Sequence, residues 1–122
     1  MSKIADFSDQ EFELVRGLVA ERYQDEVELL LADSELRLDP DSSEMVSCPT
    51  IFWNHGDVNF VVFKAGDGRY RTQFFYTPRD QYGTGRYEYD DLSECVATVL
   101  QVQADHEREK QGVKSGSTGA DL

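Results

Sequence analysis

The sequence predicts an α+β fold: an antiparallel sheet of about four strands in meander order, flanked by an N-terminal and a C-terminal helix. Three observations predict it. Helix-start signals stand near both ends of the chain, at Ser8 and at Asp91, whereas strand-like alternation fills the middle. A glycine-rich loop, residues 65–68, joins two alternating runs as a hairpin. We expect one domain, residues 1–111, and a flexible Gly/Ser-rich tail, residues 112–122.

The first helix has a well-marked start and an ambiguous end. Ser8 and Glu11 have the spacing of a capping box, in which each side chain satisfies a backbone donor at the helix start. The apolar stripe that begins at Phe12 continues into the following leucines, so we predict a helix over residues 9–32. The same residues also alternate in a strand-like way, which leaves a strand within residues 25–33 as the alternative.

The middle of the chain predicts the sheet. The expected strands are a short one at residues 36–38 and then residues 50–55, 59–64, 69–77 and 86–89, with residues 39–47 as a solvated loop. Eleven of the fourteen aromatic residues lie between Phe52 and Tyr89, so the sheet should hold the aromatic core. Both faces of the central hairpin are apolar, but two helices cover only one face. We expect either a second contact surface, in a dimer or with a partner, or loops that fold back over it.

The second helix is predicted from a second capping box. Asp91 and Glu94 have the required spacing, and the apolar residues of the stretch 92–102 then fall on one face. We expect the polar run after Val102 to fray from the core. The many β-branched residues leave a strand as the weaker alternative.

Charge is the extreme property of the composition. The chain has 24 acidic and 12 basic residues, a net charge of −12 and a pI near 4.4. Repulsion from phosphates argues against direct nucleic-acid binding and against anionic membranes. The acidity fits two interpretations: a surface for a basic partner, or solubility in a salty cytoplasm. With neither a secretory signal nor a long apolar run, we expect a cytoplasmic protein.

No motif in the sequence indicates a particular catalytic reaction. The nearest nucleophile, base and acid are Cys48, His55 and Asp57, but spacing along one strand does not assemble a triad. We interpret Cys48 and Cys95 as buried free thiols, His106 as a helix-terminal residue, and predict neither a cofactor nor a metal.

The resulting hypothesis is a small acidic, non-enzymatic protein that acts by stoichiometric protein–protein binding. Such a protein would be an inhibitor, immunity or anti-defence protein that engages a basic, nucleic-acid-handling partner. The alternatives are an accessory or chaperone-like subunit of a larger cytoplasmic assembly, for which a homodimer is one form, and a Cys/His enzyme. The candidate partner-binding residues are Glu88, Asp90, Glu94, Trp53, Tyr70 and Tyr76.

Overall fold

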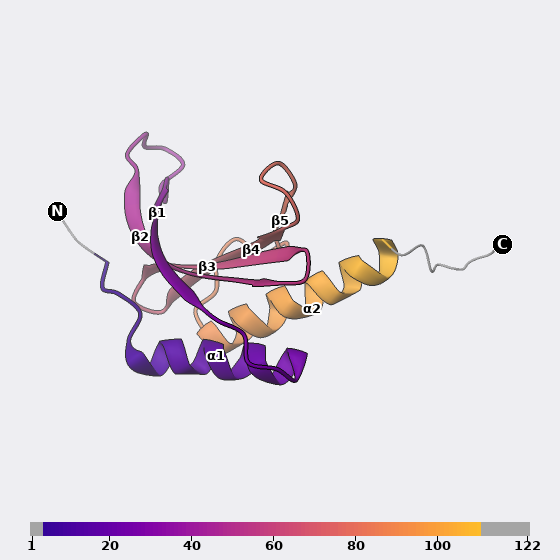
Figure 1. The fold of residues 1–122 in the computed structure, drawn as a ribbon. Helices are drawn as coiled ribbons and strands as arrows, with labels where there is room; N and C mark the ends of the chain where they lie inside the picture. Colours follow the sequence, from indigo (N-terminus) through magenta and orange to yellow (C-terminus); the bar gives the residue numbers. More distant parts are fainter. Residues whose placement is uncertain (1–3, 111–122) are drawn as a thin grey trace.

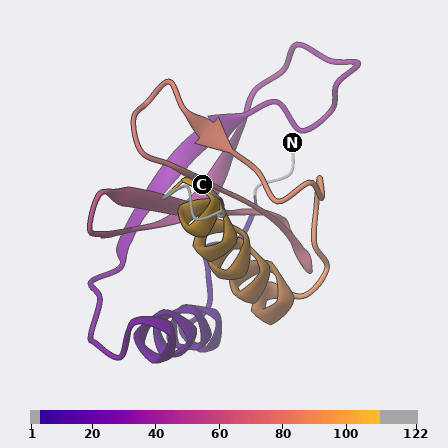
Figure 2. The ribbon, with the colours of Figure 1, turned by 90° about the vertical axis from the view of Figure 1, so that its right-hand side faces the viewer.

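The computed structural model describes residues 4–110 and shows two helices on an antiparallel sheet (Figure 1). Its elements in chain order are α1 (Asp9–Tyr23), β1 (Leu30–Leu36), β2 (Val46–His55), β3 (Val58–Gly66), β4 (Arg69–Phe75), β5 (Gln81–Tyr82) and α2 (Leu92–Lys110). The strands are hydrogen-bonded in the order β1-β2-β3-β4-β5, which is the predicted meander order, with five strands where about four were predicted. Figure 2 shows both helices on the same side of the sheet. The predicted fold class is confirmed, whereas the predicted tail, residues 112–122, lies outside the described residues.

An aromatic row across the three central strands forms the middle of the core. Trp53 on β2 pairs with Phe60 on β3, which in turn pairs with Phe74 on β4. The Trp53 and Phe60 rings stack with their centroids 5.1 Å apart. All three side chains are almost fully buried, under Val15 and Val19 of α1 and the apolar face of α2. Such cross-strand aromatic pairs fix the register of the sheet, because a slip of one residue would turn them to the opposite face.

Helix α1 begins as predicted but ends earlier. The Glu11 backbone N–H donates to Ser8 Oγ at 3.1 Å, and the Ser8 N–H donates to Glu11 Oε1 at 2.8 Å, so the capping box is confirmed. The helix stops at Tyr23 because Gln24 adopts the left-handed conformation, with φ of 55°. The predicted helix over residues 9–32 is therefore wrong beyond residue 23.

Strand β1 takes the place of the predicted helix end. Leu30 pairs with Phe52 and Leu36 pairs with Val46, so the residues between them form a full-length strand along β2. Pairing with β2 supplies backbone hydrogen bonds that outweigh the local helix propensity. The predicted strand at residues 36–38 is wrong for the same reason, since β1 ends at Leu36. Strand β2 begins at Val46, inside the predicted loop.

The segment between β4 and α2 also differs from the prediction. Residues 86–89 form no strand, and only Tyr89 makes a single bridge, to Tyr70. The fifth strand is instead Gln81–Tyr82, which pairs with the end of β4. Gly85 then takes a positive φ of 89°, which turns the chain away from the sheet.

Helix α2 shows half of the predicted capping box: Asp91 caps the helix, whereas the Glu94 carboxylate pairs with Arg86. Asp91 Oδ1 accepts the N–H groups of Ser93 and Glu94, at 2.9 and 3.2 Å. The helix continues to Lys110, beyond the point where the sequence predicts fraying. Near the C-terminal end of α2, the His106 ring stacks on Tyr76, the residue that follows β4.

The second face of the sheet is covered largely by the chain itself. Four side chains on this face are at most 9% exposed: Cys48, Thr50, Val61 and Ala65. Arg71 and Tyr87 both donate to the Leu38 carbonyl oxygen, at 3.4 Å. These bonds tie the segment after β1 to β4 and to the segment before α2. Of the two expectations for this face, the structure favours loops that fold back over it.

Candidate protein-interaction surface

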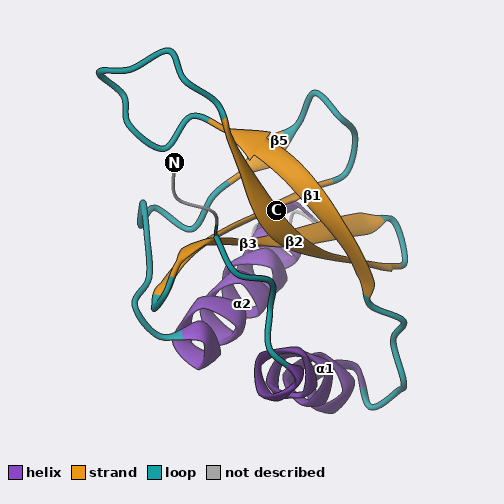
Figure 3. Ribbon diagram, turned by 90° about the vertical axis from the view of Figure 1, so that its left-hand side faces the viewer, coloured by secondary structure: helices purple, strands orange, loops and turns teal. Residues whose placement is uncertain are grey.

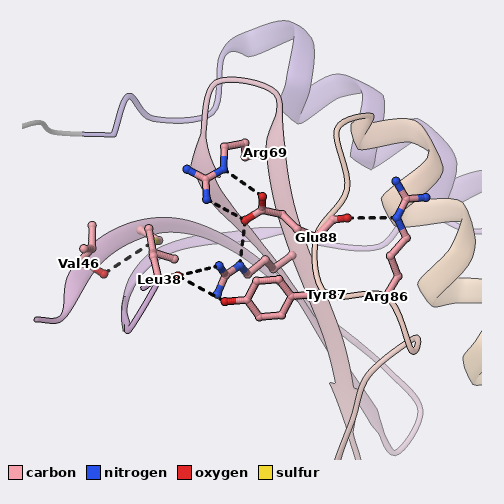
Figure 4. A network of polar contacts seen from close by, with 8 residues as sticks. Leu38, Val46, Arg69, Arg86, Tyr87 and Glu88 are labelled. Atoms are coloured by element: carbon pink, nitrogen blue, oxygen red, sulfur yellow. Dashed lines mark hydrogen bonds and ion pairs between the residues drawn. The ribbon is translucent and has the colours of Figure 1, made fainter. Parts of the chain in front are cut away.

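Two of the three acidic residues selected from the sequence, Glu88 and Glu94, lie in ion pairs. Glu88 accepts hydrogen bonds from Arg69, at 3.0 and 3.1 Å, and from Arg71 Nε at 3.2 Å (Figure 4). The Arg71 guanidinium also lies 4.1 Å from the centroid of the Tyr87 ring. The hydrogen bond from Arg69, followed by that from Arg71, holds the pKa of Glu88 below its ordinary value. The charge of Glu88 is therefore compensated, and its ion pairs join β4 to the segment before α2.

The other two acids of that group differ from each other. Glu94 Oε2 lies 3.1 Å from Arg86 Nη1, so its charge is also compensated. Asp90 is exposed and forms no ion pair with any residue in the range 4–110. The start of α2 thus carries less uncompensated negative charge than its sequence indicates.

The aromatic candidates lie in the core or at its border. Trp53 is 0% exposed and Tyr70 is 6% exposed, so the surface of the folded chain presents neither ring. Tyr76 is partly buried, and its hydroxyl lies 3.2 Å from His106 Nδ1 and 3.0 Å from Glu107 Oε2. Trp53 and Tyr70 thus pack β2 and β4 into the core, and Tyr76 joins the end of β4 to α2.

A buried polar cluster fixes the N-terminal segment to the sheet. Lys64 Nζ lies 2.8 Å from Glu11 Oε1 and donates to the Asp6 carbonyl oxygen at 3.1 Å. The Tyr70 hydroxyl donates to the other oxygen of Glu11. Burial, and then the hydrogen bond to Glu11, raise the pKa of Tyr70. The capping residue of α1 is thereby also the counter-ion of a buried lysine.

The largest uncompensated negative charge lies elsewhere, along the chain between α1 and β2. Residues 25–45, which we call the acidic edge segment, contain eight acidic residues and a single arginine. Five of these acids belong to β1 or the loop after it and form no ion pair with described residues: Asp33, Glu35, Asp39, Asp41 and Glu44. Counting the charges of residues 25–45 in the sequence would have revealed this surface. The acidic residues near the start of α2, which the sequence analysis selected, do not belong to it.

The acidic edge segment also exposes apolar side chains. Leu30 and Leu31 on β1 are 49% and 66% exposed, and Met45 before β2 is 51% exposed. The hairpin of β1 and β2 extends away from the helices, with its loop at the tip (Figures 1 and 3). The acidic edge segment therefore combines exposed apolar side chains with charged ones, as protein interfaces do.

The structure does not bring the candidate catalytic residues together. Cys48 and His55 stand seven positions apart on β2 and point to opposite faces, about 20 Å apart for an extended strand. Cys48 is buried, and its thiol contacts the Val46 carbonyl oxygen at 3.6 Å. His55 is stacked on Tyr23, with the ring centroids 3.7 Å apart. Burial raises the pKa of both thiols, that of Cys95 to about 12.

Residues 4–110 contain neither a metal-binding cluster nor a membrane-spanning helix. No group of three His, Cys, Asp or Glu side chains in this range converges as a metal ion would require. No helix in the same range has the length and apolarity needed to cross a bilayer.

Comparisons with known proteins supply no precedent for this surface. No family model matches the chain, and searches of curated proteins and of solved structures found no match. The function of this chain is therefore inferred from its own geometry and charge.

Proposed function

We propose that this protein acts by stoichiometric binding to a protein with a basic surface, as an inhibitor, immunity or anti-defence protein does when it occupies a nucleic-acid-handling partner. The observation that carries the proposal is the acidic edge segment, in which eight acids accompany one arginine on an exposed strand and its flanking loops. Nothing in this function requires catalysis by the chain.

The charge distribution gives the binding a physical basis. Among residues 4–110, seven ion pairs engage bases with acids of the two helices, with Glu88 and with Glu26 at the start of the acidic edge segment, so much of the remaining negative potential arises from unpaired acids. Complementary potential speeds the encounter of two proteins and orients them, and its effect falls with ionic strength. Leu31 and Met45 supply apolar contacts that would hold the complex once formed.

A second candidate function is favoured by the same exposed leucines. An accessory or chaperone-like subunit would use an exposed leucine such as Leu31 in its main contact, and charge would only keep the free chain in solution. The two functions predict different salt dependence. A complex held mainly by charge weakens steeply as salt rises, whereas an apolar complex survives high salt.

Affinity purification from the native host, followed by calorimetry, tests the proposal. The full chain serves as bait at low salt, and mass spectrometry identifies the retained proteins. We expect a partner with a basic surface that binds at one-to-one stoichiometry and weakens about tenfold or more between low and physiological salt. A retained partner whose affinity is insensitive to salt would favour the accessory-subunit function instead. Turnover of a substrate by the chain alone would contradict both.

A further inference from the structure

One edge of the sheet has unpaired backbone groups over a full strand. Strand β1 is the first in the sheet order and pairs on one side only, with β2. No backbone hydrogen bond within residues 4–110 joins it to any other segment. In an antiparallel pair, every second residue points its N–H and C=O groups away from the neighbouring strand. The seven-residue β1 therefore presents a row of free donors and acceptors.

This edge lacks the features that usually prevent strand pairing. Edge strands are commonly short, or interrupted by proline, lysine or a bulge. At the opposite edge, β5 is only two residues long. Strand β1, by contrast, has the sequence LLADSEL, and its register against β2 is continuous. Its only protective charges are acidic, at Asp33 and Glu35.

A groove beside β1 can receive side chains of an added strand. It has a volume of about 300 Å³ and is lined by Leu31, Asp33 and Pro49 of the hairpin and by Asp6 of the N-terminal segment. Leu31 and Asp33 are two residues apart, so they face the same side of the strand. A partner strand would place an apolar side chain beside Leu31 and a basic side chain between Asp33 and Asp6.

We propose that β1 accepts an extended, basic segment of a partner protein as a sixth strand of the sheet. This inference rests on the proposed function and specifies the surface and the mode of binding. Main-chain hydrogen bonds would provide affinity, and the carboxylates would select the charge of the added strand. A second copy of this chain is disfavoured as the occupant. Pairing of β1 with itself would set Asp33 and Glu35 against like charges, between molecules that each carry −12.

The experiment follows amide hydrogen exchange of the full chain by NMR while a synthetic peptide is added at low salt. In the peptide, Lys and Arg alternate with Val and Thr, over a length that spans β1. Two further peptides carry N-methyl groups on the odd or on the even residues, which leaves charge unchanged but blocks one edge of the added strand. The chain is also tested as Asp33→Asn/Glu35→Gln. A matched control, Glu21→Gln/Glu109→Gln, removes the same charge from exposed positions on the helices.

We expect every second amide of β1 to gain protection when the unmethylated peptide binds. One methylated peptide should bind about tenfold more weakly than the other. The Asp33→Asn/Glu35→Gln variant should weaken binding more than the control does. Salt-sensitive binding that protects amides elsewhere, or equal effects of both methylated peptides, would overturn strand addition and leave the proposed function standing. Absence of binding at low salt would overturn both. Concentration-dependent protection of β1 without peptide would assign the edge to a second copy.

Discussion

The buried pair of Lys64 and Glu11 offers a sharp test of how the fold is held together. Lys64→Met removes the ammonium group but keeps a long apolar side chain, and Glu11→Gln removes the charge while retaining a residue that completes a capping box. The Lys64 side chain is 7% exposed and that of Glu11 is 18% exposed. The two groups are therefore partly removed from water and depend on each other.

The cost of Lys64→Met follows from what remains in place. Loss of one partner from a buried ion pair costs about 3–5 kcal/mol, because the other charge is left uncompensated. Glu11 keeps some contact with water and two other donors, Ser8 N–H and the Tyr70 hydroxyl. We therefore expect about 3 kcal/mol, at the low end of that range. In the double variant the effects should be non-additive, with a coupling of about 1–3 kcal/mol.

Urea denaturation of the wild type, the two single variants and the double variant, at several pH values, measures the cost of each substitution and the coupling between them. Burial would raise the pKa of Glu11, but hydrogen bonds from Lys64, Tyr70 and Ser8 outweigh it and hold the pKa below 4.5. A carboxylate with a lowered pKa in the folded state stabilises it above the unfolded pKa, and this contribution is lost as the pH falls through the folded pKa. The wild type should thus lose more stability than Lys64→Met between about pH 6 and about pH 3. Additive effects, each below about 1 kcal/mol, would show that the pair does not hold α1 to the sheet.

Three other changes test the core, the helix end and the thiols. Phe74→Ala should lower the free energy of unfolding by about 3–5 kcal/mol, because the ring is 1% exposed, and an unchanged Tm would remove it from the core. Gln24→Gly should raise the free energy of unfolding by about 0.5–1 kcal/mol, because glycine adopts the positive φ without strain; a decrease in urea denaturation would contradict this. Cys48 and Cys95 should react slowly with iodoacetamide until the protein unfolds, because burial raises the pKa of each thiol. Rapid alkylation of native Cys48 near pH 6 that slows when His55 is replaced would instead indicate a thiolate–imidazole pair.

Local sequence signals predicted where both helices start. Pairing between strands that are distant in sequence determines where α1 ends and where β1 forms. The cap at Ser8 involves residues three positions apart, so its sequence pattern is sufficient. The end of α1 depends on β1, whose Leu30 pairs with Phe52 far along the chain. The stretch around Leu30 and Leu31 suits a helix and a strand about equally, and the neighbouring strand determines which one forms.

The candidate site was harder to predict because charge was counted without its partners. Glu88 and Arg69 are 19 residues apart in sequence and form a two-bond ion pair in space. The aromatic candidates failed as surface groups for a related reason, since the strand pattern does not show which face the helices cover. Trp53 and Tyr70 face the helices. The acidic composition of the acidic edge segment can be read from the sequence, but its exposure depends on β1 being the edge strand.

The association rate constant with the purified basic partner tests the central claim most directly. Two variants each remove three negative charges, one from the acidic edge segment and one from the start of α2: Asp33→Asn/Glu35→Gln/Glu44→Gln and Glu88→Gln/Asp90→Asn/Glu94→Gln. Stopped-flow measurements at low salt compare them with the wild type, after circular dichroism has shown that both are folded. The account predicts that the edge variant associates about tenfold more slowly and that the α2 variant changes less, because most of its charges are already paired. Equal rates for both variants, or a larger loss in the α2 variant, would contradict it.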